Sequence, residues 1–157
     1  MRQSSRRRSW FSFVTLAALV VTMALAVTAG DKADLINKNS AGVSLKGYDA
    51  VAYFTEGKAV KGNSRFQYDW MGAKWLFASA ANRDQFAKDP AKYAPQFGGY
   101  CAWAVSNNYT YDADPEIWKI VEGKLYLNYN QVARLRWERD IPGRIKSGEQ
   151  NWPNLHK

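Results

Sequence analysis

Two stretches of the chain have apolar residues typical of strands on both sides of a glycine turn, and the first of them alternates apolar and polar residues. The first surrounds Met71-Gly72, and its alternating aromatic residues are Phe66, Tyr68, Trp70, Trp75 and Phe77. Successive side chains of a strand point to opposite faces, so this pattern predicts a β-hairpin. Residues 117–121 and 124–129, which flank Glu122-Gly123, predict a second hairpin.

Helix-starting residues follow the first hairpin. Ser79 can cap a helix that runs to about Lys88, and Asp89-Pro90 can begin a further turn through Tyr93. Upstream of the hairpin, Asp49 can cap a short helix over 50–54. These signals predict short helices on either side of the strands.

A longer helix is predicted after the second hairpin, over residues 130–141. Ala133, Trp137 and Ile141 recur every four residues and would lie on one face of it. We expect Pro142-Gly143 to end this helix and a short helix to follow over 144–148. Residues 100–105 form an apolar run whose pattern leaves the element type open.

The first 29 residues contain the segments of a secretory signal in the usual order. Four arginines precede the apolar run 11–25, and small residues follow it at 24–26 and 27–29. The alternative is an uncleaved signal anchor, which would be the chain's connection to a membrane. Either way we expect export, to the periplasm or the extracellular space after cleavage. The arginine run also loosely resembles a twin-arginine signal.

Removing the signal changes the charge of the protein. The whole chain has a formal net charge of +8, but four of its 22 Lys and Arg residues lie in the first 29 residues and none of its 14 Asp and Glu residues does. The remaining chain therefore carries +4, a modest excess that does not indicate a nucleic-acid partner. Its other partners stay open, a protein partner included.

About 130 residues remain, enough for one domain with its own core. We find no internal repeat or long linker among them. The predicted fold is α+β: a single small domain in which two β-hairpins form an antiparallel sheet packed against several short helices. Its expected parts are the signal (1–29), a flexible lead-in (30–42), the domain (43–153) and a tail (154–157).

Few residues of the exported part can perform polar chemistry. It has one cysteine, Cys101, and one histidine, His156, near its end. A histidine-based triad, a histidine-rich metal site and an internal disulfide are therefore excluded. The carboxylates show no spacing of paired catalytic acids or of a calcium loop. These absences favour a protein that is not an enzyme.

Four blocks of the sequence resemble exported bacterial YHS-domain proteins. Residues 47–54 (GYDAVAYF) are similar to the GYDPVAYF opening of that branch, and the similarity continues at 70–79, 98–102 and 123–128. It spans residues 42 to about 152. The resemblance implies a YHS-like domain and export, and says little about an activity.

The chain departs from the metal-associated members of that family. Their two cysteines correspond to Ala78 and Asn82 here, and neither can supply a thiolate. The family's metal site therefore does not carry over to these positions. Copper or haem stays a hypothesis that the spacing of ligands does not support, with Cys101 and Met71 as the weak metal candidates.

The remaining candidates surround the single thiol. The double glycine 98–99 allows close backbone approach before Cys101, and we place a candidate ligand pocket near Tyr48, Asp49, Tyr100, Cys101 and Trp103. Two of these residues also have a purely structural interpretation. Cys101 can be buried, which makes a thiol inert, and Asp49 can serve as a helix cap. The many aromatic residues form either the core or the wall of a groove.

Three functions follow. The first is a non-enzymatic exported module that binds a small ligand or a soft metal in that pocket. The second is a structural or protein-interaction domain in which Cys101 is merely buried. The third is a thiol-dependent redox enzyme that uses Cys101, although no resolving cysteine exists within the exported part.

Overall fold

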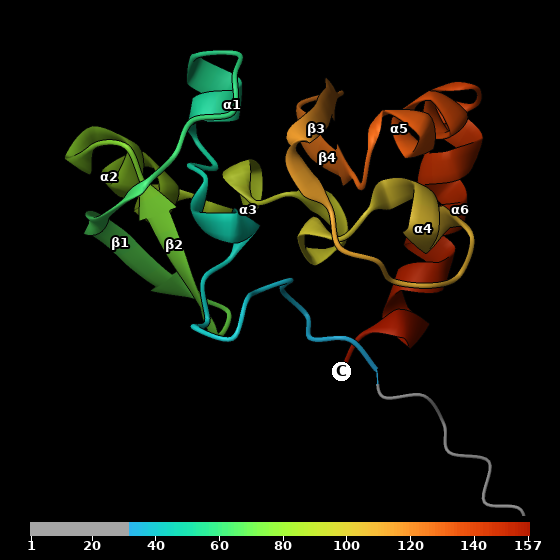
Figure 1. The fold of residues 1–157 in the computed structure, drawn as a ribbon, viewed down its shortest axis with the longest axis horizontal. Helices are drawn as coiled ribbons and strands as arrows, with labels where there is room; N and C mark the ends of the chain where they lie inside the picture. The colour runs from blue at the N-terminus through green and yellow to red at the C-terminus, as the bar shows by residue number, and fades with distance from the viewer. Residues whose placement is uncertain (1–31) are drawn as a thin grey trace, which may run out of the picture. The chain divides into compact units, whose positions relative to one another are not determined.

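The computed structural model describes residues 32–157, and the predicted signal sequence lies outside this range. Figure 1 shows the elements along the chain. In order they are the 3-10 turn η1 (Leu45–Gly47), α1 (Ala52–Thr55), β1 (Asn63–Trp70), β2 (Ala73–Phe77), α2 (Ala80–Lys88), α3 (Pro90–Tyr93), the 3-10 turn η2 (Gln96–Gly99), α4 (Ala102–Ser106), β3 (Asp114–Val121), β4 (Lys124–Asn128), α5 (Gln131–Glu138) and α6 (Ile141–Leu155). The apolar run whose element type was open is largely helix α4.

The predicted α+β class and both predicted hairpins are confirmed. β1 pairs antiparallel with β2, and β3 pairs antiparallel with β4. Within residues 32–157 the hairpins do not join, so the expected shared sheet is instead two separate two-stranded sheets. A lone two-stranded hairpin is marginally stable in water. Each hairpin therefore depends on the helices packed against it.

The expectation of a chain without repeats is wrong, because the two hairpins belong to two copies of one structural unit. Adding 51 to the bounds of β1 and β2 gives the bounds of β3 and β4. The pairing registers agree as well: the pair Tyr68–Trp75 corresponds to the pair Lys119–Tyr126. Both hairpins even shift register at the same place, after the first paired residue of the leading strand.

The repeat extends upstream of the strands with an offset of 52 residues. The segment Gly47–Ala50 corresponds to Gly99–Ala102, and in sequence the two read GYDA and GYCA. Each is preceded by two residues with positive φ, at 45–46 and at 97–98. A backbone hydrogen bond of this segment also repeats. The Asp49 N–H donates to the Val60 carbonyl at 2.8 Å, and the Cys101 N–H donates to the Tyr111 carbonyl at 2.9 Å. We call residues 45–93 the first repeat and residues 97–144 the second repeat.

The helix after each hairpin is built in the same way. Ser79 Oγ accepts a hydrogen bond from the Asn82 N–H at 3.1 Å and so caps α2, as predicted, and Asn130 Oδ1 caps α5 through the Ala133 N–H at 2.8 Å. Each helix carries a buried aromatic ring in its last turn. Phe86 lies 4.9 Å from Trp75, and Trp137 lies 5.2 Å from the corresponding Tyr126.

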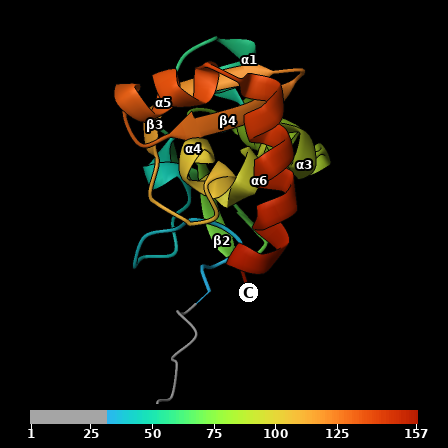
Figure 2. The same ribbon diagram turned by 90° about the vertical axis from the view of Figure 1, so that its right-hand side faces the viewer.

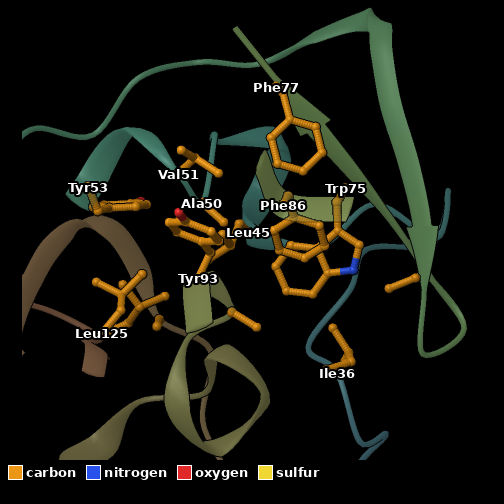
Figure 3. Packing of buried hydrophobic residues seen from close by; sticks show 14 residues of the cluster. Ile36, Leu45, Ala50, Val51, Tyr53, Trp75, Phe77, Phe86, Tyr93 and Leu125 are labelled. Carbon is orange, nitrogen blue, oxygen red and sulfur yellow. The ribbon is translucent and has the colours of Figure 1, made fainter. Parts of the chain in front are cut away.

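The largest buried cluster centres on the first repeat and takes in part of the second hairpin. Figure 3 shows the rings of Trp75, Phe77 and Phe86 gathered at its centre, with Leu125 of β4 on the same cluster. A smaller cluster around Trp137 holds α4, α5 and α6 together. Burial of these rings supplies most of the apolar area that stabilises so small a fold.

The end of the second repeat differs from the prediction. α5 stops at Glu138, and Pro142-Gly143 lies in the first turn of α6 rather than ending a helix. Asp140 Oδ1 accepts from the Gly143 N–H at 3.0 Å, and proline suits the first turn because its missing N–H has no partner there. α6 runs for 15 residues and packs along α4 (Figure 2).

Residues of the predicted lead-in and tail contact each other. The Ala33 N–H donates to the Leu155 carbonyl at 3.0 Å, and the Lys157 N–H donates to the Ala33 carbonyl at 3.0 Å. The Asn37 N–H donates to the Gly98 carbonyl at 2.8 Å. From residue 32 onward, no helix has both the length and the apolar character needed to cross a bilayer.

Candidate functional site

A cavity of about 230 Å³ lies in the second repeat, between the start of α4 and helix α5. The single cysteine forms part of its wall, and the rest is mostly aromatic or small and apolar. Its lining residues are Cys101, Trp103, Ala104, Tyr109, Tyr111, Tyr129, Asn130, Val132, Ala133 and Arg136. The thiol is therefore buried, yet it faces a hollow rather than a filled core.

The aromatic wall consists of two edge-to-face pairs. The ring centroids of Trp103 and Tyr109 are 6.2 Å apart, and those of Tyr111 and Tyr129 are 4.7 Å apart. The three tyrosines are each more than 40% exposed, so they form the rim, whereas Cys101 is 1% exposed. Perpendicular rings around a hollow present both faces and edges to a planar guest.

One cation lies at the wall. The Arg136 guanidinium carbon is 5.4 Å from the ring centroid of Trp103, which is the geometry of a cation–π contact. Burial raises the pKa of Tyr109, and a hydrogen bond with the Tyr129 side chain raises the pKa of Tyr111. Both hydroxyl groups are therefore protonated at neutral pH and can donate hydrogen bonds.

The thiol contacts a buried amide. Cys101 Sγ donates to Asn128 Oδ1 at 3.7 Å, and the same oxygen accepts from the Trp103 N–H at 3.1 Å. Asn128 is fully buried at the end of β4, and its Nδ2 has no hydrogen-bond partner among residues 32–157. Asn128 thus orients the thiol and the first turn of α4.

Asp49, a predicted site residue, has a different task. Its side chain is fully buried, and Oδ1 accepts hydrogen bonds from the N–H groups of Val51 (2.8 Å) and Ala52 (3.3 Å). It therefore holds the turn that leads into α1, although the helix begins at Ala52 with Val51 at the cap position, later than the predicted 50–54. Oδ2 accepts from the Ala78 N–H at 2.8 Å and from Asn82 Nδ2 at 2.7 Å. Both oxygens are engaged by the protein itself. We call this arrangement the Asp49 hub.

The cavity occupies the place in the second repeat that the Asp49 hub occupies in the first. Cys101 corresponds to Asp49 and Ala133 corresponds to Asn82, so both side chains that make the polar bridge are replaced by smaller or apolar ones. Asn128 takes over the cap by accepting from the Trp103 N–H. The space that the bridge fills in the first repeat is therefore part of a hollow in the second.

The other predicted site residues lie elsewhere. The Tyr48 hydroxyl donates to Glu116 Oε1 at 2.8 Å, and the Tyr100 ring packs 5.9 Å from that of Trp152. Neither lines the cavity, so of the five candidates only Cys101 and Trp103 do. Tyr129 is one of the aromatic residues weighed as core or groove wall, whereas Tyr109 and Tyr111 were not predicted and Arg136 was not placed in the pocket. A sequence signal for them existed in the closely spaced Tyr109 and Tyr111, which lie outside the predicted elements.

The residues present do not fit a metal site. Residues 32–157 contain no group of three or more His, Cys, Asp or Glu side chains that could hold an ion. Met71 is 51% exposed at the tip of the first hairpin and lines a different hollow from Cys101. The positions of the family's cysteines, Ala78 and Asn82, instead donate hydrogen bonds to Asp49.

A comparison of the sequence with known protein families gives a match that lies mostly in the first repeat. The sequence model described as YHS domain matches residues 51–97, a range that ends where the second repeat begins. No curated protein and no solved structure matches the chain. All of the cavity-lining residues, Cys101 included, lie after residue 97. The chain therefore resembles the YHS domain over residues 51–97, mostly within its first repeat, and the candidate site lies beyond the matched segment.

Proposed function

We propose that this chain is an exported, non-enzymatic module that binds a small planar molecule in the Cys101 cavity. The observation that carries the proposal is the cavity itself: two pairs of perpendicular rings stand around a hollow of about 230 Å³ with a thiol and a single arginine in the wall. Concave apolar sites with a few polar groups are the usual form of small-molecule sites.

The size of the cavity limits the ligand. An engineered apolar cavity of about 150 Å³ holds benzene, whereas pockets for drug-sized ligands measure about 300–1,000 Å³. A hollow of about 230 Å³ therefore accepts one aromatic ring with small substituents. Haem is much larger than one such ring, so the volume of this hollow favours a smaller ligand over haem.

The wall lacks the groups that a thiol enzyme needs. Activation of a cysteine requires a neighbouring base or cation that stabilises the thiolate. None of the cavity-lining residues is Asp, Glu, His or Lys, and the Cys101 thiol hydrogen-bonds a neutral amide. Arg136 stacks on Trp103 instead of pairing with the thiol. These features support binding rather than catalysis.

Export rests on the order of features in the first 29 residues, a positive segment followed by an apolar run and small residues. A single buried cysteine is compatible with an oxidising compartment, because no second thiol is available for a wrong disulfide. Fractionation of expressing cells, with N-terminal sequencing of the product, tests this part. An unprocessed cytosolic protein would overturn it.

Binding is tested with single-ring aromatic fragments on the protein made from the full-length gene, followed by NMR. We expect saturable shifts that disappear in Val132→Trp, which places a bulky ring at the cavity. Leu135→Trp is the matched control, since Val132 and Leu135 are both exposed residues of α5 and only Val132 lines the cavity. Equal binding by the two variants, or no binding by the unmodified protein, would overturn the proposal.

Element analysis and an absorbance spectrum of the same protein, beside Cys101→Ser, test the metal form of the hypothesis. We expect no stoichiometric metal and no visible chromophore in either protein. Metal that is present in the unmodified protein and lost in the variant would show that Cys101 is a ligand, contrary to the donor set described above.

A partner protein is the second candidate occupant. Tyr109, Tyr111, Tyr129 and Val132 are each more than 40% exposed around the same hollow. Exposed apolar side chains gathered at one place are typical of interaction surfaces. This candidate would be favoured if fragments do not bind and Val132→Trp instead abolishes an association.

A further inference from the structure

A second hollow adjoins the Cys101 cavity and differs from it in charge. It measures about 500 Å³ and shares Trp103 and Arg136 with the first. Its lining residues are Trp103, Arg136, Arg139, Asp140, Gly143, Arg144 and Ser147. Because Trp103 and Arg136 border both hollows, the two lie next to each other on either side of these side chains. We call the second hollow the arginine groove.

Three guanidinium groups face this groove without acidic partners. Within residues 32–157, no carboxylate oxygen lies within 4.0 Å of a side-chain nitrogen of Arg136, Arg139 or Arg144. By contrast Arg134, on the same helix as Arg136, pairs with Glu138 at 3.0 Å. An arginine without a carboxylate partner keeps its donors available for an incoming anion.

The one acidic residue of the groove is already engaged. Asp140 Oδ1 accepts from the Gly143 N–H at 3.0 Å and caps α6. The positive end of the dipole of this 15-residue helix lies at the same place and favours a negative group. Arg144 Nη1 donates to Asn107 Oδ1 at 3.3 Å, which holds that guanidinium at the groove. One carboxylate therefore faces three arginines and a helix N-terminus.

We propose that the ligand is an aromatic carboxylate, with its ring in the Cys101 cavity and its carboxylate bound by the arginine groove. This inference rests on the proposed function and adds the chemical class of the ligand. The planar fork of an arginine matches the two oxygens of a carboxylate. Arg136, at the boundary of the two hollows, is the first guanidinium that the acid group meets.

The experiment compares four probes by calorimetry at low salt with the protein made from the full-length gene. They are benzoate, its neutral isostere benzamide, phenyl phosphate and inorganic phosphate. We expect benzoate to bind at least about tenfold more tightly than benzamide, because a charge-assisted hydrogen bond is stronger than a neutral one. Its affinity should fall as salt is added. Inorganic phosphate, which lacks the ring, should bind weakest.

Variants assign the effect to the groove. Arg139→Gln and Arg136→Gln should each weaken benzoate binding about tenfold and leave benzamide unchanged. Arg136→Gln also removes the contact with Trp103 and can therefore disturb the cavity. The side chain of Arg139 lines only the groove, so Arg139→Gln is the decisive variant in that case. Arg134→Gln is the control on the same helix and should change neither affinity, since Arg134 lines neither hollow.

The failures are distinguishable. If benzoate and benzamide bind equally, or if Arg134→Gln weakens benzoate as much as Arg139→Gln does, this inference is wrong and binding of a ring still stands. If no probe with a ring binds, the proposed function fails as well. Tighter binding of phenyl phosphate than of benzoate would keep the groove as an anion site and overturn the assignment to a carboxylate.

Discussion

The two repeats have the same order of elements and the same hairpin registers, and they differ at one buried polar contact. In the first repeat, Asp49 and Asn82 join the start of α1 to α2 through a buried carboxylate. In the second, Cys101 and Ala133 stand at the corresponding positions, and a cavity is present. Two residue differences at one polar contact therefore accompany the change from a filled position in the first repeat to a hollow in the second.

The neighbourhood of the second repeat also differs. The four-residue helix α3 follows the first hairpin and α2, whereas the 15-residue helix α6 follows the second hairpin and α5. Both begin at an aspartate cap with closely similar backbone angles, Asp89 and Asp140. By position α3 corresponds to Ile141–Arg144, and the rest of α6 is an extension that the first repeat lacks. α6 packs against α4, and Ser147 of the extension lines the arginine groove. The groove thus includes a segment that the first repeat does not have.

The largest effect should come from the buried rings in the last turns of α2 and α5. Phe86→Ala and Trp137→Ala each remove a fully buried aromatic side chain, and we expect each to lower the free energy of unfolding by about 3–5 kcal/mol. Denaturant unfolding followed by circular dichroism measures both. If Trp137→Ala costs less than about 1 kcal/mol, the second repeat is not held together as the first is.

The Asp49 hub should matter more to stability than the thiol that replaces it. Asp49→Ala leaves buried N–H donors without their acceptor and should cost about 3 kcal/mol. Cys101→Ala removes one sulfur beside a hollow and should cost about 1 kcal/mol. The same unfolding measurement compares the two variants. A larger loss of stability in Cys101→Ala than in Asp49→Ala would contradict a structural role for Asp49 and a binding role for the Cys101 position.

Rebuilding the hub in the second repeat sharpens the comparison. Cys101→Asp alone buries a carboxylate without the amide partner, and Ala133→Asn alone buries an amide without the carboxylate. Together they should restore the pair, with a favourable coupling of about 1–2 kcal/mol in a double-mutant cycle. The double variant should also lose fragment binding at the cavity. Additive destabilisation with unchanged fragment binding would show that the two positions do not correspond.

The helix caps should show nearly equal effects. Ser79→Ala and Asn130→Ala each remove the side-chain acceptor for one N–H at the start of α2 and α5. We expect each to lower the free energy of unfolding by about 1 kcal/mol. Thermal unfolding gives the values, with the exposed Leu135→Ala as a control that should change little. A loss at one cap alone would contradict the equivalence of the two helices.

The smallest effect is an acid sensitivity confined to the second repeat. The hydrogen bond from Lys119 lowers the pKa of Glu138 below its usual value of 4.5, whereas the corresponding residue of the first repeat is Ala87. A lowered carboxyl pKa contributes stability above the unfolded-state value, and this is lost as the pH falls through the folded-state value. Glu138→Gln should remove this dependence, by less than about 1 kcal/mol. Parallel pH profiles of the two proteins would contradict it.

The local elements of the fold were predictable because their signals are local. The aromatic alternation around Met71-Gly72 and the cap at Ser79 are confirmed in place. α6 was predicted too short, because Pro142-Gly143 reads as a helix end unless the cap at Asp140 is seen. The repeat was not predicted, because the two copies preserve the size and burial of their side chains more than the identity of their residues. Examples are the corresponding pairs Trp75 and Tyr126, and Phe86 and Trp137.

The amino-acid sequence by itself determined the fold class, the hairpins, the YHS match and the scarcity of metal-binding side chains, since these depend on composition and on neighbours along the chain. The tertiary structure alone decided what surrounds Cys101. Two of the four protein donors to Asp49, Ala78 and Asn82, come from 29 and 33 residues away. The hollow likewise needs Trp103 of α4 beside Tyr129 and Arg136 from beyond the second hairpin. Periodicity does not report such contacts, because packing between elements creates them.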